Sequence, residues 1–242
     1  MYFKKMEEEK IIESLTSVLP RGFEIISQFP LLVLCKKSDN GNFQEIVLAD
    51  LENRKINNLF GAIHIHQIES LVKPNYKPYK DGGTIRIGKH YKLFNKYPAR
   101  TRILEQLPIM LENPKDLEKA GDLIKTFIYE DAFPFFEYWQ DIRDFIPFLE
   151  NDDMIYVAWD VFSGEAMYKK MTVMWLCNHP RYEDFKEASL NSIQSRLEKD
   201  PENNNLKKAL NNTFRFLKRL EKTKPLYEWD ESFLEKKPFK II

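Results

Sequence analysis

The chain has 242 residues, of which 43% are hydrophobic and 31% charged, so it can bury a sizeable core in one large domain or two closely packed ones. Its 37 basic and 37 acidic residues give a formal net charge of zero, which argues against nucleic acid or a membrane as an obligatory partner. The longest apolar runs, such as residues 31–35, are far too short to span a bilayer.

The first twenty residues predict an amphipathic helix. Apolar side chains recur at helical spacing over residues 6–19, opposite a face of four glutamates, and residues 20–22 end the helix. Because residues 1–10 contain no apolar segment of the kind found in secretory signals, we expect a cytoplasmic protein. Cys35 and Cys177 have apolar neighbours and no CxxC spacing, so we expect both to be reduced core residues.

After this helix the pattern changes to that of β-strands. Four runs with strand character follow, at residues 23–27, 31–36, 43–50 and 58–68. An Asp-Asn-Gly sequence at residues 39–41 supplies a tight turn between the second and third runs. Sequential strands joined by short turns favour antiparallel pairing. The sequence therefore predicts an antiparallel sheet of roughly four strands.

Residues 73–112 are predicted to form a connector, because proline, glycine, lysine and tyrosine are concentrated in most of this segment. Residues 83–90 approach the frame of a phosphate-binding loop, but His90 stands where that loop needs serine or threonine. The residues that follow, 91–94, look extended and not helical. A β-turn or hairpin is therefore the favoured interpretation.

From residue 113 onward helical periodicity dominates. Asn113 and Pro114 fit the N-cap and first turn of one helix, and Pro134 fits the first turn of a second, which Pro147 should bend or end. The tail from Pro225 carries three aromatic residues and is predicted to dock on the body in extended form. Further helices are predicted at residues 152–162, 165–177, 182–199 and 205–222.

These elements predict an α+β fold in one compact body. Residues 1–72 form a lobe with an N-terminal helix and the antiparallel sheet, and residues 73–112 form the basic connector. Residues 113–242 form a larger, all-helical lobe with a docked C-terminal tail.

Charge is distributed unevenly along the chain. Residues 73–102 carry nine basic residues and one acidic residue, whereas residues 103–165 carry four basic and fifteen acidic residues. The connector could fold back over the acidic helices, or either region could attract a charged partner. Tyrosines among the connector's basic residues are typical of nucleic-acid-binding surfaces. However, no nucleic-acid module surrounds them and the adjacent acidic segment would repel a polyanion, so we do not expect that partner.

The sequence contains no HExxH, GxSxG or paired CxxC signature, which favours a non-catalytic protein, and we assign no catalytic residue and no cofactor. Its sharpest chemical feature is the pair His64 and His66, because residues i and i+2 of a strand share a face and two imidazoles could bind one zinc or iron ion. Nothing in the spacing specifies a third ligand. We therefore predict no metal site, and a metal-dependent enzyme centred on His64 and His66 is the alternative.

The opening helix, the Arg-Gly-Phe turn at residues 21–23 and the strands that follow resemble uncharacterised bacterial families found among polymorphic-toxin immunity proteins. The resemblance covers roughly residues 6–72. It implies stoichiometric binding of a protein partner and carries over no catalytic residue.

We therefore predict a bacterial-type, non-catalytic, immunity-like module that binds a protein partner through a charged surface. Basic toxins and nucleases present cationic clefts, and a carboxylate-rich surface matches that charge and speeds association. Five aromatic residues at 133–139 are expected to pack in the core, and any that reaches the surface could anchor the partner. The predicted partner-binding residues are Glu130, Asp131, Glu137, Asp141 and Asp144.

Overall fold

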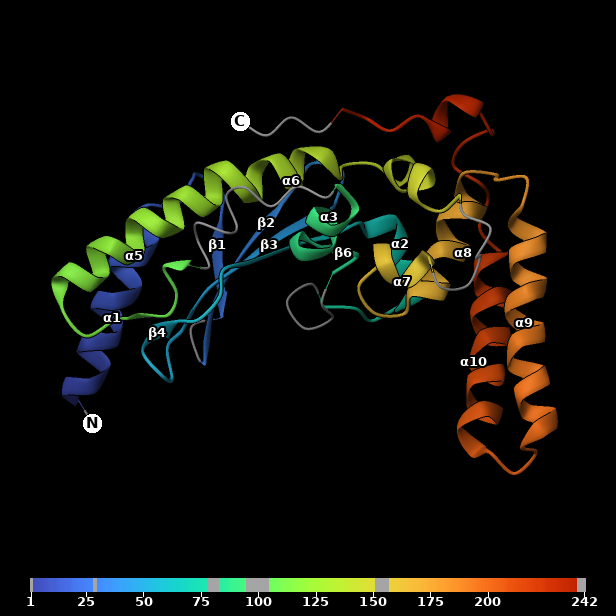
Figure 1. Cartoon of the computed structure of the whole chain (residues 1–242), viewed down its shortest axis with the longest axis horizontal. Coiled ribbons are helices and arrows are strands. Elements are labelled where there is room, and N and C mark those ends of the chain that lie inside the picture. The colour runs from blue at the N-terminus through green and yellow to red at the C-terminus, as the bar shows by residue number, and fades with distance from the viewer. Residues whose placement is uncertain (1, 28–29, 78–82, 95–104, 151–156, 239–242) are drawn as a thin grey trace.

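The computed structural model describes residues 2–27, 30–77, 83–94, 105–150 and 157–238. Across these ranges the chain combines an antiparallel sheet with many helices, as the sequence predicts (Figure 1). None of the described helices is both long and apolar enough to cross a membrane.

The described residues place seven strands in one sheet, whereas the sequence predicts roughly four. The strand order is β1-β2-β3-β4-β7, and β5 pairs with both β3 and β6. Every pairing is antiparallel. Three strands contain only two residues each, which is too short for alternation to reveal them. The strands are β1 (Glu24–Ser27), β2 (Leu31–Lys37), β3 (Phe43–Asp50), β4 (Lys55–Ile56), β5 (Phe60–His64), β6 (Ile85–Arg86) and β7 (Ile109–Met110).

The tight turn predicted between β2 and β3 is confirmed. Gly41 has a φ of +83°, which glycine adopts without the steric cost that a side chain would add. Its N–H donates to the Ser38 carbonyl across 2.9 Å. The two long neighbouring strands therefore pair in the register that this turn fixes.

The predicted strand at residues 58–68 is wrong in its second half. β5 ends at His64, and the helix α2 (His66–Val72) follows. The Thr84 hydroxyl accepts the Ile65 N–H at 2.9 Å, while the Ile65 carbonyl accepts two amides of the first turn of α2. The backbone N–H at the change from strand to helix is thus bound by a residue 19 positions further along the chain. Local periodicity could not reveal this hydrogen bond.

The predicted connector contributes β6, β7 and the helix α3 (Ile87–Phe94) in its described part. Residues 91–94 are therefore helical, and the prediction of an extended segment there was wrong. The reason is a short apolar stripe that packs into the core. Its buried members, at helical spacing, are Ile87, His90 and Tyr91.

Helices dominate the rest of the chain. Asn113 caps α5 by accepting two backbone N–H groups, with Pro114 in the first turn, and both features confirm the prediction. Pro134 lies in the first turn of α6, and Pro147 lies inside a 3-10 helix, η2. The bounds are α1 (Tyr2–Thr16), α5 (Pro114–Thr126), η1 (Phe127–Ala132), α6 (Phe133–Tyr138), η2 (Ile142–Phe148), α7 (Val157–Val161), α8 (Ala166–Leu176), α9 (Tyr182–Lys199), α10 (Asn204–Leu220) and η3 (Glu231–Leu234).

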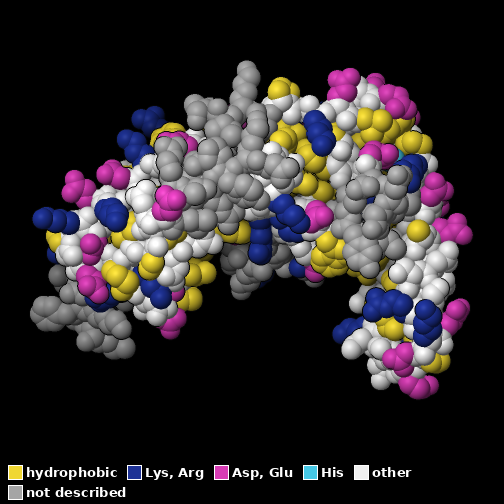
Figure 2. All heavy atoms as spheres, in the orientation of Figure 1, with side chains coloured by type: hydrophobic (Ala, Val, Ile, Leu, Met, Phe, Trp, Pro, Cys, Tyr) yellow, Lys and Arg dark blue, Asp and Glu magenta, His cyan; other side chains and the backbone are white. Residues whose placement is uncertain are grey.

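Sheet and helices share one hydrophobic core. Helix α1 packs against α5, and α5, η1 and α6 follow one another as a long helical rod across the top of the molecule (Figure 1). Figure 2 shows the lower side hollowed between the limb that holds α1 and β4 and the limb formed by α9 and α10. Core residues from the sheet and the rod include Leu34, Ile46, Leu48, Ile63, Ile124, Ile128 and Phe135.

The C-terminal tail returns over the helical half after α10. The N–H groups of Leu226 and Tyr227 donate to the Leu176 carbonyl at the end of α8, across 2.8 and 3.1 Å. The Trp229 ring meets the His179 ring edge-on, with 4.4 Å between centroids. These contacts bring the tail to the surface of η2.

Candidate functional site

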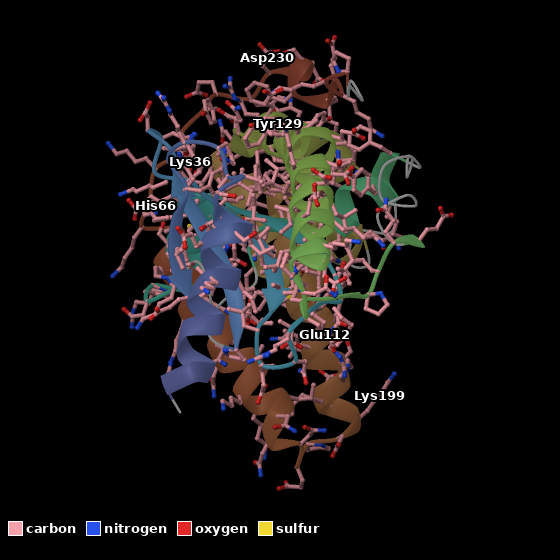
Figure 3. All side chains as sticks on the ribbon, turned by 90° about the vertical axis from the view of Figure 1, so that its left-hand side faces the viewer. Lys36, His66, Glu112, Tyr129, Lys199 and Asp230 are labelled. Carbon is pink, nitrogen blue, oxygen red and sulfur yellow. The ribbon has the colours of Figure 1, made fainter. Side chains whose placement is uncertain are left out.

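The helical rod contains one turn of π-helix, η1, and such turns are frequent at functional sites. Tyr129 lies in this turn and is 46% exposed. Its ring packs edge-on against Phe133, with 5.3 Å between centroids. Tyr129 is labelled near the top of the rod in Figure 3. Glu130 follows it directly, and Glu137 lies about two helical turns along the same face. The Tyr129 surface is the name used for these four residues, Tyr129, Glu130, Phe133 and Glu137.

The five predicted carboxylates do not share one exposed face. Asp131 is only 3% exposed and accepts a hydrogen bond from the Tyr91 hydroxyl. Asp144 is 5% exposed. Glu130 is half-buried, whereas Glu137 is exposed and forms no ion pair with any residue in the described ranges. Direct contact between a partner and all five carboxylates is therefore incompatible with this arrangement.

Asp141 and Asp144 together cap η2. The Asp141 carboxylate accepts the Arg143 N–H at 2.9 Å, and the Asp144 carboxylate accepts the Asp141 N–H at 2.9 Å, which forms a capping box. Burial opposes ionisation of Asp141, but hydrogen bonds from Arg143 and Tyr227 and the Arg143 charge outweigh it and lower the pKa of Asp141. Burial raises the pKa of Asp144, although Lys237 acts in the opposite direction.

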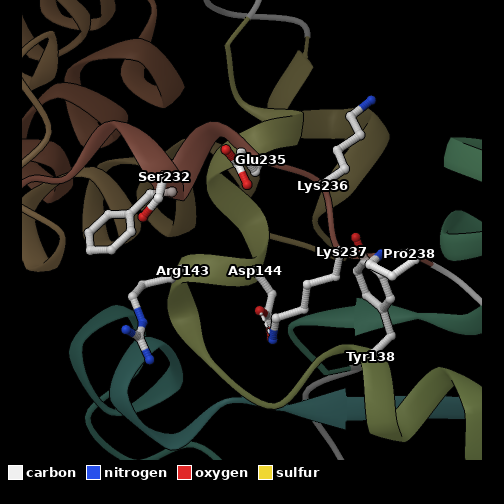
Figure 4. A pocket seen from close by; sticks show the side chains of 9 residues that line it. Tyr138, Arg143, Asp144, Ser232, Glu235, Lys236, Lys237 and Pro238 are labelled. Carbon is white, nitrogen blue, oxygen red and sulfur yellow. Dashed lines mark ion pairs between the residues drawn. The ribbon is translucent and has the colours of Figure 1, made fainter.

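The tail closes over these two carboxylates. The Arg143 guanidinium lies 4.3 Å from the ring centroid of Tyr227 and 5.7 Å from that of Phe233. Lys237 forms an ion pair with Asp144 beside a cavity of about 420 Å³ between the tail and η2 (Figure 4). The chain's own lysine thus occupies the place where the sequence predicted that a basic partner would meet Asp144.

The basic connector neutralises part of the acidic segment, in line with one of the two interpretations of the charge pattern. Lys92 pairs with Asp160 across 2.5 Å, and Lys73 pairs with Glu165 across 3.2 Å. Both acids lie in the last part of the acidic segment, so these pairs leave Glu137 exposed.

His64 and His66 lie in different environments. His64 is buried, and its Nε2 lies 3.2 Å from Glu45 Oε2. His66 starts α2 and is exposed at the edge of the molecule, with its Nδ1 3.2 Å from the Tyr76 hydroxyl (Figure 3). Because the strand ends at His64, the argument that both imidazoles share one strand face does not apply. In the described part of the chain no group of three His, Cys, Asp or Glu could hold a metal ion.

A buried network around Lys169 was not recognised in the sequence. The Lys169 ammonium donates to the carbonyls of Gly83 and Ser163, both at 2.7 Å, and lies 2.9 Å from Glu69 Oε1. The Thr84 hydroxyl donates to the same carboxylate oxygen at 2.6 Å. Burial lowers the pKa of Lys169, and the Glu69 charge partly offsets that effect. The three N–H donors of the ammonium meet three oxygen acceptors, on Gly83, Ser163 and Glu69, so the network fastens α8 to α2 and to the segment just before β6.

His90 is enclosed by aromatic rings. Its Nδ1 accepts the indole N–H of Trp139 at 2.9 Å. The ring centroids of Phe94, Phe135 and Tyr138 lie 4.8, 5.5 and 5.6 Å from the imidazole centroid. Desolvation by this burial lowers the pKa of His90 to about 3. The residue is therefore a neutral packing element at physiological pH.

His90 should make the folded chain less stable as the pH falls. The unfolded chain takes up a proton near pH 6.5 that the folded chain takes up only near pH 3. The free energy of unfolding should therefore fall by up to about 1.4 kcal/mol per pH unit in this window as the pH decreases. In urea unfolding, His90→Leu should reduce the slope of the free energy of unfolding against pH between roughly pH 4 and 6. The reduction should correspond to about one bound proton fewer in the difference between the unfolded and folded states. An unchanged slope would show that His90 titrates alike in both states.

Comparisons with protein-family models, curated proteins and solved structures gave no match for this chain. The resemblance of residues 6–72 to immunity-protein families therefore stays a prediction from pattern.

Proposed function

We propose that the protein is a non-catalytic, immunity-like module that binds a basic protein partner through the Tyr129 surface. The observation that carries the proposal is the exposed Tyr129 ring, 46% accessible and adjacent to Glu130 on the rod. Most large aromatic side chains of the rod are buried, so an exposed one has no packing role of equal weight. Tyrosine is among the residues that most often dominate interface energies.

The carboxylates supply the negative charge that the Tyr129 ring lacks. Glu130 follows Tyr129 in the chain and Glu137 lies about two helical turns along the rod, and these carboxylates would attract a cationic cleft and speed the encounter. Asp141 is half-buried, and its carboxylate already binds Arg143 and the Tyr227 hydroxyl of the tail, so the proposal does not assign it to partner contact. Asp131 and Asp144 are buried and support the surface indirectly, because their hydrogen bonds hold η1 and η2 in place. The proposal therefore assigns partner contact to two of the five predicted carboxylates, Glu130 and Glu137.

Glu137→Lys and Tyr129→Ala should weaken the complex in different ways. The partner is first captured from native lysate and purified, and its binding rates are then measured by surface plasmon resonance. Glu137→Lys should lower the association rate constant severalfold at low salt, and the difference should shrink as salt is added. Tyr129→Ala should raise the dissociation rate constant by roughly tenfold, because it removes the anchor.

The control is Glu198→Lys, which makes the same charge change at an exposed position of α9, in the limb formed by α9 and α10. It should leave both rate constants almost unchanged. Equal losses for Glu198→Lys and Glu137→Lys would mean that net charge alone drives association. A partner whose rates are indifferent to the changes at both Tyr129 and Glu137 would refute the proposed surface.

A further inference from the structure

Helix α10 is strongly basic. It carries five lysines and arginines and no acidic residue. Figure 2 shows lysine and arginine side chains gathered toward the lower end of the limb formed by α9 and α10. The positive side chains of such a helix repel one another unless anionic groups lie near them. Its charge therefore needs a structural or functional reason.

A cleft of about 500 Å³ runs along one side of α10, facing the segment just after α2. Asn212, Arg215 and Arg219 line it at positions i, i+3 and i+7, which share one helix face. Lys73 and Tyr76 line the opposite wall. The volume falls within the range of about 300 to 1,000 Å³ that is typical of sites for small molecules.

The walls of this cleft are held firmly. The Arg219 guanidinium donates to the Leu71 carbonyl at 2.6 and 2.8 Å and to the Val72 carbonyl at 3.2 Å. The Phe216 ring stacks on Tyr168 with 4.6 Å between centroids. The position of the Arg219 guanidinium is therefore set by the fold, which reduces the entropy lost when a ligand binds.

The cleft has a surplus of positive charge. Lys73, Arg215 and Arg219 face it, and Glu165 is the single acidic residue among the residues that line it. Glu165 pairs with Lys73 across 3.2 Å. Arg215 is exposed and forms no ion pair with any residue that the structure describes. A guanidinium free to donate two parallel N–H groups is thus presented to the cleft.

We propose that this cleft binds a small phosphate-bearing molecule, with Arg215 as the principal phosphate ligand. Guanidinium groups match the geometry of phosphate oxygens and form charge-assisted hydrogen bonds with them. Asn212 adds an amide that can donate or accept toward the rest of the ligand. Burial raises the pKa of Tyr76 to about 12, so its hydroxyl keeps its proton beside an anion. This site is separate from the Tyr129 surface and does not depend on it.

The test titrates the full-length protein with inorganic phosphate, pyrophosphate and citrate at constant ionic strength, followed by amide NMR shifts. Saturable shifts should cluster on residues that line the cleft, including the Asn212 side-chain amide, and pyrophosphate should bind more tightly than phosphate. Arg215→Gln should weaken pyrophosphate binding by roughly tenfold, which corresponds to the loss of a charge-assisted pair. Because Arg215 is exposed, this variant should keep the thermal stability of the parent.

Arg196→Gln is the matched control, since Arg196 is an exposed arginine on α9 that does not line the cleft. It should bind pyrophosphate as the parent does. Equal weakening by the two substitutions, or shifts that do not saturate with either phosphate, would overturn the proposal. Tighter binding of citrate than of pyrophosphate would also overturn it, by assigning the cleft to a carboxylate ligand.

Discussion

Lys169→Met is expected to lower the free energy of unfolding by about 3–5 kcal/mol, the cost of leaving a buried charge without its partner. Lys169 and Glu69 are 0% and 1% exposed, so water cannot replace the lost contact. The carbonyls of Gly83 and Ser163 would lose their donor as well. Urea unfolding followed by circular dichroism measures the change.

Adding Glu69→Gln to this variant should recover part of the loss, because the uncompensated negative charge disappears and Thr84 can still donate to the amide oxygen. Lys208→Met, at an exposed position of α10, should change stability by less than about 0.5 kcal/mol. A loss of the same size from Lys208→Met would show that the buried contacts of Lys169 are not the cause of the lost stability.

Gly83→Ala should destabilise the protein by about 2–4 kcal/mol through backbone strain and steric overlap. Gly83 has a φ of +78°, where a side chain is strained. A Cβ there would lie 2.9 Å from the Cβ of Ala62 and 3.1 Å from the Ile63 carbonyl oxygen. The start of β6 would have to move away from β5 to admit it.

Gly164→Ala separates the two contributions. Gly164 also has a positive φ, +63°, but a Cβ there would meet nothing within 4 Å. Only the conformational cost of about 1 kcal/mol should remain. Thermal unfolding of both variants gives the comparison, and a loss at Gly164 as large as that at Gly83 would rule out the overlap with Ala62 as the cause.

Local pattern was enough to predict most of the helices and the longer strands. The Asn113 cap and the Gly41 turn depend on residues next to each other in the chain, and both are present. The errors occurred where a distant residue decides the structure. Thr84 meets the backbone where β5 gives way to α2, and the buried side of α3 is too short for its period to stand out.

The candidate site was less predictable because burial of a charge depends on its partners. Asp141 and Asp144 have the three-residue spacing of a capping box, so the sequence contained a signal for their structural role. Asp131 accepts a hydrogen bond from Tyr91, 40 residues earlier, and no local sequence pattern indicates this contact. The exposure of Tyr129 among buried aromatic residues equally depends on how the whole rod packs.

The bonds from Arg219 to the end of α2 join residues 147 and 148 positions apart in the chain. The Asn42 side chain similarly reaches the Gln140 carbonyl, 98 residues later. Closing such long loops costs entropy before the contact is made, so we expect slow folding. During synthesis strands β1 to β6 are made before the rod of α5, η1 and α6, with which they share the core. Their apolar inner face then stays uncovered, and aggregation of the nascent chain competes with folding at that stage.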